Sequence, residues 1–383
     1  MQNILDEEEL KQNENRKKEL IDLIASKESL LFLGAGSSAL VGYKVWTEII
    51  KDLERLANEC GSGFIIDKIK REGFPLSYVE DIKRHIENKT GCLNVYHALL
   101  YNEFSPKSPP SVIFHDTLIN LPFKGFITTN YDTVLEAALS KKYPNSGHDN
   151  SLIIKEESAQ RVSEFLLSFD HSRYQKRVAH LHGRFDDPAS IILSHDDYVK
   201  KYGFEELNSG GSSKEANRPW SLHRKILWAI LATRRVIFIG FSLNDPYFKF
   251  MLSLVSNDLW RWDHPIHYAI IGLSSEGDSA QLEKMRAKDL KRQFGIEVVF
   301  YEIIERSHRG LENVVNDINM GCQLHQRILN YPLKGDSTQL DSQSVDNREI
   351  AQTGSQGAFR NLHQSTWMES INRKMERNLN NED

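Results

Sequence analysis

Two glycine-containing turns, each placed directly after an apolar run, constrain this chain of 383 residues most strongly. Residues 33–37 have the sequence LGAGS after the apolar run 30–33, and residues 240–246 have the sequence GFSLNDP after the run 235–239. An apolar run that ends in such a turn predicts a buried strand with a tight turn at its carboxyl end. Ligands of open α/β sheets bind at these ends. The pattern therefore predicts an α/β fold with a binding site along one edge of its sheet.

Two polar segments lie between these turns in the chain. Residues 128–132 are TTNYD at the end of a β-rich run, and residues 180–183 are HLHG at the end of a second one. A glycine turn that opens a helix offers backbone N–H groups to a phosphate. An Asn/Asp pair and a histidine that titrates near neutrality can orient reactants and accept a proton. Together the four segments predict a nucleotide on which the protein carries out chemistry.

Strands alternate with helices along most of the chain, which predicts a parallel, doubly wound, Rossmann-like sheet. The expected strands are residues 30–33, 125–129, 178–183, 235–239, 267–271 and 296–301. The expected helices are residues 7–26, 46–60, 133–139 and 222–232, and one that begins at Pro246 and is capped by Asp245.

The same pattern suggests a division of the chain into three parts. Residues 1–29 form an amphipathic helix, and residues 30–330 form the nucleotide-binding domain with a helical insertion at about 46–103. Residues 208–213 have the composition of a mobile loop. Residues 331–383 form a polar linker and tail, in which residues 367–377 can form a short amphipathic helix.

Composition points to a cytoplasmic protein. The three cysteines, Cys60, Cys92 and Cys322, are too scattered for a disulfide framework and fit a reducing compartment. The acidic amino terminus does not look like a signal peptide, and no run reaches the roughly 18 apolar residues of a membrane span. The net charge of −5 argues against nucleic acid binding over the whole surface. The basic stretches 234–235 and 284–292 are typical of solvated faces, so nucleic acid contact is expected to be indirect at most.

In their order, the four segments resemble the motifs of the sirtuin family. Sirtuins carry a GAG-S turn, a TQNID segment, an HG segment and a GTSLxVxP segment, and the resemblance spans about two thirds of this chain, residues 30–273. It implies an NAD-binding sheet in which His182 is the general base, assisted by Asn130 and Asp132. The NAD contacts that it implies are Gly34, Ala35, Gly36, Ser37, Ser38, Thr129, Asn130, Asp132, Gly240, Ser242 and Leu243.

The departures from the sirtuin pattern are equally specific. Deacylating sirtuins hold a structural zinc with two CxxC pairs, and this chain has no such pair. Their GIPDFR loop is replaced by residues 42–47, GYKVWT, which lack its arginine. Gly36-Ser37 followed by Trp46, and the segment GFSLNDP at residues 240–246, resemble instead the bacterial sirtuin-like domains of anti-phage defence systems, which cleave NAD. This resemblance includes stand-alone proteins that work with a HerA-type ring ATPase. The resemblance implies an NAD glycohydrolase without a metal.

Such a hydrolase would drain the cell of NAD unless it were held inactive, so we expect a homo-oligomer that can dock to a ring ATPase. The amphipathic helix before Leu30 and residues 367–377 are the expected interfaces.

Three other functions stay open at this stage. A protein deacylase or ADP-ribosyl transferase would need a peptide groove, which the missing zinc module disfavours. A nucleotide sensor without turnover would not need both Asn130 and His182. A nuclease subunit of a ring-ATPase complex would need a carboxylate metal site.

The singled-out residues also have purely structural interpretations. Gly34 and Gly36 can simply permit a tight turn, and Asn130 and Asp132 can begin a helix. His180 and His182 would share one face of a strand and suggest a metal, but no third ligand is near, so we expect His180 to be packed or hydrogen-bonded beside His182. The cluster at residues 195–197, His-Asp-Asp, is typical of a turn or a helix cap.

Overall fold

The computed structural model describes residues 4–144, 151–170, 177–203, 220–259, 266–304 and 308–330. Within these residues, parallel strands form one seven-stranded sheet in the order β3-β4-β2-β1-β5-β6-β7. The strands are β1 Ser29–Leu33, β2 Phe126–Thr128, β3 Ser151–Ile153, β4 Val178–His180, β5 Arg235–Ile239, β6 His267–Ser274 and β7 Ile296–Ile303. This order confirms the predicted doubly wound α/β sheet, because the chain winds outward from β1 in both directions.

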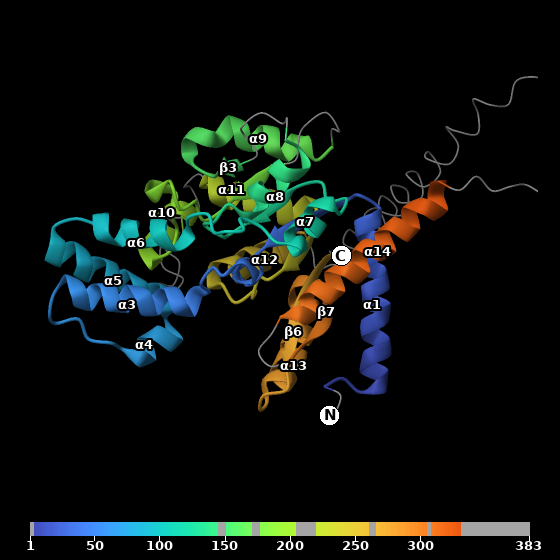
Figure 1. Ribbon diagram of the computed structural model, residues 1–383, viewed down its shortest axis with the longest axis horizontal. Coiled ribbons are helices and arrows are strands. Elements are labelled where there is room, and N and C mark those ends of the chain that lie inside the picture. The colour runs from blue at the N-terminus through green and yellow to red at the C-terminus, as the bar shows by residue number, and fades with distance from the viewer. Residues whose placement is uncertain are drawn as a thin grey trace, which may run out of the picture. The chain divides into compact units, whose positions relative to one another are not determined.

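Helices connect the strands throughout the described residues (Figure 1). They are α1 Glu7–Ala25, α2 Ala35–Ser38, α3 Trp46–Cys60, α4 Lys68–Gly73, α5 Pro75–Thr90, α6 Asn94–Phe104, α7 Ile113–Asn120, α8 Val134–Lys142, α9 Ala159–Ser168, α10 His195–Tyr202, α11 Leu222–Thr233, α12 Pro246–Asp258, α13 Ser279–Phe294 and α14 Arg309–Asn330. The expected loop at residues 208–213 and the expected tail and helix beyond residue 330 lie outside the described residues.

Strand β1 is buried on both faces, as the centre of a parallel sheet must be. Leu30 and Phe32 pack into the core that α11, α12 and α13 cover, whereas Leu31 and Leu33 pack into the opposite core, which contains residues of α1, α7, α8 and α14. The alternation of successive side chains across the sheet therefore divides one apolar run between two cores.

Helix α1 belongs to the second core and is not a free amphipathic element. Leu20 and Ile24 are fully buried, and the helix packs on α14 and β7 of the same chain. Asn13 clamps the edge strand β7: its Nδ2 donates to Phe300 O (3.0 Å), and its Oδ1 accepts from Phe300 N (2.8 Å). The expectation that the apolar face of this helix serves an interface is therefore wrong, because the chain covers that face itself.

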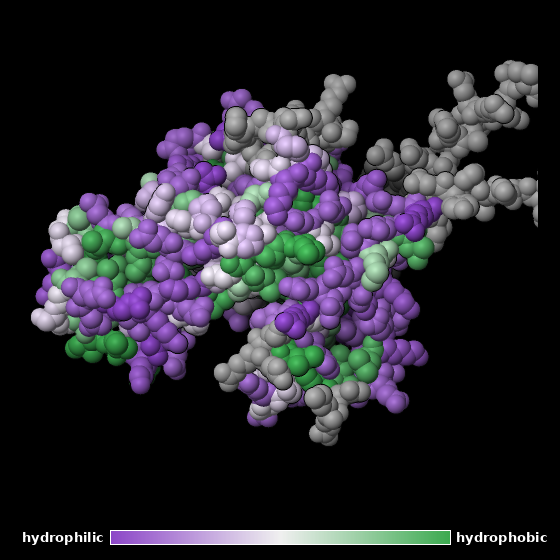
Figure 2. All heavy atoms as spheres, viewed as in Figure 1, coloured by the Kyte–Doolittle hydropathy of each residue, from purple (hydrophilic) through white to green (hydrophobic). Residues whose placement is uncertain are grey.

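Helices α3, α5 and α6 pack around a core of their own. Its members include Leu53, Val79 and Leu100, and Tyr131 and Val134 join it from the loop after β2 and from α8. Figure 1 shows α3, α4, α5 and α6 gathered beside the sheet. Apolar atoms are exposed near α4 at the end of this group (Figure 2), where Ile69 and Phe74 are largely exposed.

The structure shortens one predicted strand and adds another. Strand β4 ends at His180 rather than at residue 183, because the chain turns at Gly183, whose φ is +85°. His182 therefore lies in the loop after the strand, not on one strand face with His180. Strand β3 at the sheet edge was not predicted, because only one of its three residues is buried, whereas the equally short β2 and β4 are buried throughout.

The two glycine turns at the centre of the sheet touch each other. Gly36 N donates to Gly240 O (2.9 Å), and Gly34 N donates to Ile239 O (3.0 Å). A Cβ on Gly34 would lie 2.5 Å from Gly240 O, and a Cβ on Gly240 would lie 2.6 Å from Ser37 N. The glycines are therefore required by the close approach of the two backbones.

We expect Gly240→Ala to lower the free energy of unfolding by about 2–5 kcal/mol, because the new Cβ adds a clash to the strain of a positive φ (+64°). The matched control is Gly277→Ala, which also has a positive φ (+55°) but nothing within 4 Å of the new Cβ, and should cost about 1–2 kcal/mol. Urea unfolding of both variants measures the difference. Equal losses would show that the turns can separate without cost.

Candidate functional site

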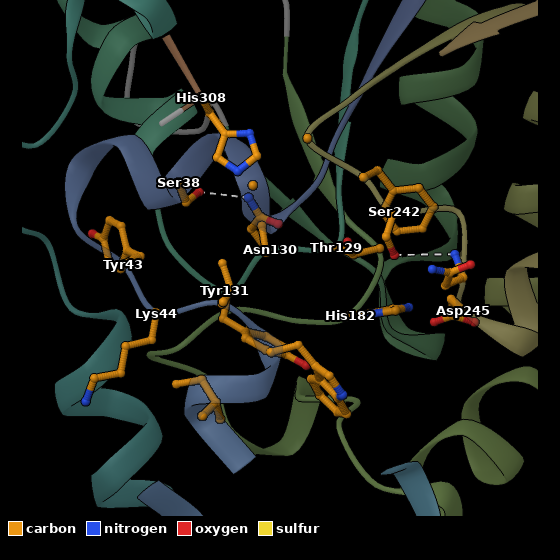
Figure 3. A pocket seen from close by; sticks show the side chains of 18 of the residues that line it. Ser38, Tyr43, Lys44, Thr129, Asn130, Tyr131, His182, Ser242, Asp245 and His308 are labelled. Carbon is orange, nitrogen blue, oxygen red and sulfur yellow. Dashed lines mark hydrogen bonds between the residues drawn. The ribbon is translucent and has the colours of Figure 1, made fainter. Parts of the chain in front are cut away.

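A cavity of about 580 Å³ opens at the carboxyl ends of the central strands, where the sequence placed the site. Its walls come from the turns after β1, β2, β4 and β5, from β6 and β7, and from α3, α10 and α13 (Figure 3). The predicted site residues that line it are Ala35, Gly36, Ser38, Thr129, Asn130, Asp132, His182, Gly240 and Ser242.

Three of the predicted NAD contacts do not line this cavity. The side chain of Ser37 is buried and its Oγ donates to Gly34 O (2.7 Å), which stabilises the turn. Leu243 is fully buried in the hydrophobic core, and Gly34 serves the approach of the two turns. These residues shape the walls and do not form the binding surface.

The turn after β1 also offers fewer free donors than its sequence suggests. The N–H groups of Gly34, Gly36 and Ser37 donate to Ile239 O, Gly240 O and Gly34 O, respectively. The expectation that this turn presents a set of free N–H groups is therefore wrong. Three of its N–H groups donate to carbonyl oxygens of this turn, of β5 and of the turn after β5.

Hydrogen bonds hold the side-chain amide of Asn130, and its oxygen has no partner among the described residues. Its Nδ2 donates to Gly34 O (3.1 Å) and to Ser38 Oγ (2.8 Å), the bond drawn in Figure 3. These two bonds determine which way the amide faces, and its Oδ1 is buried without a partner among the described residues. A buried, unpaired acceptor is costly, so a donor on a bound ligand would relieve that cost.

Asp132 begins the helix that follows. Its Oδ1 accepts from Val134 N (3.1 Å), at the first residue of α8, which confirms the predicted helix-start role. Burial raises the pKa of its carboxyl group. The residue also lines the cavity, but Asn130 is held by Gly34 and Ser38 rather than by this carboxylate.

His180 anchors the loop that carries Asn130. Its Nδ1 is 3.0 Å from Asn130 O, and its Nε2 is 2.6 Å from Glu136 Oε1. Burial alone would lower the pKa of this fully buried ring, but the Glu136 carboxylate outweighs that effect and raises it. His180 is therefore a hydrogen-bonded structural partner of the site, as predicted.

His182 faces the cavity from an apolar and aromatic surrounding. Its ring packs edge-on against the rings of Tyr198 (5.2 Å between centroids) and Tyr202 (6.1 Å). Burial lowers its pKa to about 3, so the imidazole is neutral at pH 7 and can accept a proton.

Tyr198 connects this histidine to the turn after β5. Its hydroxyl donates to a carboxylate oxygen of Asp245, whose other oxygen accepts from Phe248 N (2.9 Å) at the start of α12. Asp245 thus caps the helix, as predicted, and also fixes the ring that packs on His182. Figure 3 shows His182 and Asp245 on the same side of the cavity.

Several lining residues escaped the sequence analysis. Tyr198 lies in the polar interval after residue 184. The sequence pattern there indicated only a turn or helix cap at residues 195–197. In the structure, Ser194 and Asp197 form the capping box of α10. Tyr43 and Lys44 line the cavity from the segment that replaces the sirtuin loop. His308 lies just before α14, and no pattern in the sequence marked it.

Part of the sheet is similar to a known family. Residues 124–299 match the family described as SIR2-like domain. The match begins just before β2 and includes three of the four motif segments; the turn after β1 lies outside it.

Similar curated proteins are named as NAD(+) hydrolases and as a defence-associated sirtuin. The NAD(+) hydrolase ThsA of Bacillus cereus is 26% identical over 310 residues, 80% of this chain and 55% of that protein. ThsA of Enterococcus faecium is 27% identical over 254 residues, 66% of this chain and 45% of its own length. The defence-associated sirtuin 2 of Bacillus subtilis is 26% identical over 243 residues, 62% of this chain and 20% of that protein. The chain thus spans about half the length of the ThsA relatives that it matches.

Among the described residues, no group of three or more His, Cys, Asp and Glu side chains is arranged to hold a metal ion. In the same part of the chain, no helix is long and apolar enough to cross a membrane.

We expect the burial of His182 to lower the free energy of unfolding as pH decreases. In the unfolded chain the ring takes up a proton near its ordinary pKa of 6.5, whereas in the folded protein it does so only near 3. The unfolded state therefore binds more protons between these values, and the free energy of unfolding falls as pH drops, by at most about 1.4 kcal/mol per pH unit for this group.

His182→Gln should accordingly flatten the dependence of the unfolding free energy on pH between 6.5 and 4, as measured by urea unfolding. His195→Gln is the control for the substitution itself, because His195 is 43% exposed and does not line the cavity. The same slope in both variants would mean that His182 is solvated in the folded protein.

Proposed function

We propose that this chain hydrolyses the N-glycosidic bond of NAD and releases nicotinamide and ADP-ribose. The observation that carries the proposal is the pairing, in one cavity, of a buried unpaired acceptor, Asn130 Oδ1, with a neutral buried imidazole, His182. The relatives named NAD(+) hydrolase support it, since the chain aligns with them along most of its own length.

The reaction needs little from the protein apart from orientation and a base. The bond from C1′ of the ribose to the pyridinium nitrogen breaks, and its electron pair neutralises the nicotinamide ring. The sugar becomes oxocarbenium-like, a water oxygen bonds to C1′, and one water proton is released. Substrate and water thus give nicotinamide, ADP-ribose and a proton.

The residues of the cavity divide these tasks. Asn130 Oδ1 accepts from a ribose hydroxyl or from the attacking water, because its amide cannot turn away. His182 takes the proton that the water or the ribose hydroxyl loses. The negative charges of the NAD pyrophosphate raise the pKa of this ring above its value in the empty site, which makes it a stronger base when substrate is bound.

The remaining predicted contacts hold the rest of the substrate. The turns after β1 and β5 lie at the centre of the cavity, and the pyrophosphate binds there beside Ser38 and Ser242. Asp132 is directed at the nicotinamide amide. Since water is the simplest acceptor and the chain lacks CxxC pairs, hydrolysis is favoured over protein deacylation.

We infer that the activity serves anti-phage defence in the bacterial cytoplasm, as the effector that depletes NAD. The names of the relatives support the setting, and the three unpaired cysteines fit a reducing compartment. A resting oligomer, docked to a ring ATPase in the manner of the HerA-type systems, would keep the hydrolase inactive until a trigger arrives.

We expect Asn130→Ala and His182→Ala to lower the rate of NAD cleavage by about 10² to 10⁴ without loss of the fold. Chromatography of nicotinamide and ADP-ribose measures the rate, and circular dichroism checks the fold. The matched controls are Asn58→Ala and His195→Ala, because neither residue lines the cavity.

Full activity of His182→Ala would refute the assignment of the base. Binding of NAD by the wild type without any turnover, in the presence of its partners, would favour the sensor function instead. Transfer of acetyl or ADP-ribosyl groups to a peptide at a rate above hydrolysis would favour the transferase function.

We also expect the purified chain to form a homo-oligomer. The exposed apolar side chains around α4, among them Ile69 and Phe74, are costly in water and suited to a subunit contact. Light scattering at micromolar concentration measures the mass, with a chain that lacks residues 367–383 for comparison. A monomer in both cases would refute the proposal.

A further inference from the structure

The cavity extends well beyond the residues assigned to the reaction. Asn130 and His182 follow β2 and β4, on one side of the central glycine turns, whereas β6, β7 and α13 form the wall on the other side. A dinucleotide that lies across the carboxyl edge of such a sheet has one half on each side of its centre. If the nicotinamide half lies at His182, the adenosine half lies against β6, β7 and α13.

The wall at this end combines apolar surface with one ion pair. Ile270, Ile271 and Ile303 supply apolar atoms that suit a purine base. The ion pair joins Glu283 and Arg286 on α13: Nη1 of the arginine lies 3.1 and 2.9 Å from the two carboxylate oxygens. Both residues line the cavity, and their side chains are only 27% and 20% exposed.

This ion pair leaves hydrogen-bonding groups unused. Nε and Nη2 of Arg286 are buried and have no partner among the described residues. Each oxygen of Glu283 keeps a free lone pair after accepting from Nη1. The pair thus places acceptors beside donors that have no partner among the described residues, with little net charge, at the end of the cavity assigned to adenosine. A ligand there meets the two buried donors when the guanidinium turns toward it.

We propose that Glu283 and Arg286 bind the two hydroxyls of the adenosine ribose and select NAD over its 2′-phosphorylated form. A vicinal diol both donates and accepts: one hydroxyl donates to the carboxylate, while its oxygens accept from the guanidinium. A 2′-phosphate has no proton to donate at neutral pH, and its charge meets the Glu283 carboxylate. The inference rests on the proposed function, because it assumes that a dinucleotide occupies the cavity.

The nearby cation does not reverse this preference. Lys249 lies close enough for Arg286 to lower its pKa, after burial as the larger cause. Its Nζ is turned toward Asn244 Oδ1 (3.4 Å), and the residue does not line the cavity. The charges that line this end of the cavity are therefore those of Glu283 and Arg286.

Calorimetric titration of the full chain with ADP-ribose and with ADP-ribose 2′-phosphate tests the proposal independently of turnover. The wild type should bind ADP-ribose at least about tenfold more tightly than its 2′-phosphate. Glu283→Gln should reduce that ratio by about fivefold to tenfold, because the repulsion is lost. Arg286→Met should weaken the binding of ADP-ribose by about tenfold, because the diol oxygens lose a charged donor.

The same helix supplies matched controls. Asp289 and Arg292 form an ion pair of the same spacing on α13 but are 57% and 74% exposed and lie outside the cavity lining. Asp289→Asn and Arg292→Met should therefore change neither affinity. Thermal unfolding of all four variants shows whether a loss of binding reflects a loss of fold, and the Glu283→Gln ratio is a measurement that simple destabilisation would not shift.

The outcomes separate this proposal from the function on which it rests. If the wild type cleaves NAD and the ratio is the same in Glu283→Gln and Asp289→Asn, the specificity role is wrong and the hydrolase function stands. A wild type that prefers the 2′-phosphate also overturns the role. If the wild type neither binds ADP-ribose nor cleaves NAD, both proposals fail.

Discussion

The close approach of two backbone turns is the constraint on which this site depends. Gly36 N donates to Gly240 O at the centre of the sheet, and a side chain on Gly34 or Gly240 would collide with the opposite turn. Because the sheet winds outward from β1 in both directions, this contact lies where the two halves meet. The loops after β2 and β4 then open on one side of it and the wall of β6 on the other, so that one cavity serves a ligand with two halves.

The reactive half is built from groups that are held before any ligand binds. Glu136, His180 and the backbone carbonyl of Asn130 form one hydrogen-bonded chain, and the side-chain amide of Asn130 is held separately from the first turn. A reacting group that is already in place costs little further ordering in the transition state. His182 differs, because aromatic rings rather than charges surround it, and burial lowers the pKa of its ring.

The other half of the cavity contains the Glu283–Arg286 ion pair. In its proposed role, this pair selects the substrate at a distance from the residues proposed for the chemistry. In this arrangement, binding at the proposed adenosine end can position the bond to be cleaved without altering the groups proposed for the reaction. The helices of residues 46–104 close the cavity on the reactive side through Trp46 and Ile49.

The sequence by itself determined the fold class of the sheet, the position of the edge at which the cavity opens and some of the residues along it, because apolar runs and polar turns are local patterns. Asn130, His182 and Ser242 were identified in this way. Only the tertiary structure decided that Ser37 and Leu243 face inward, that α1 seals β7, and that Tyr198, Asp245 and Arg286 reach the same cavity. Their side chains come from elements far apart in the chain, and no local pattern specifies which distant atoms will meet when the cores of the two sheet faces pack.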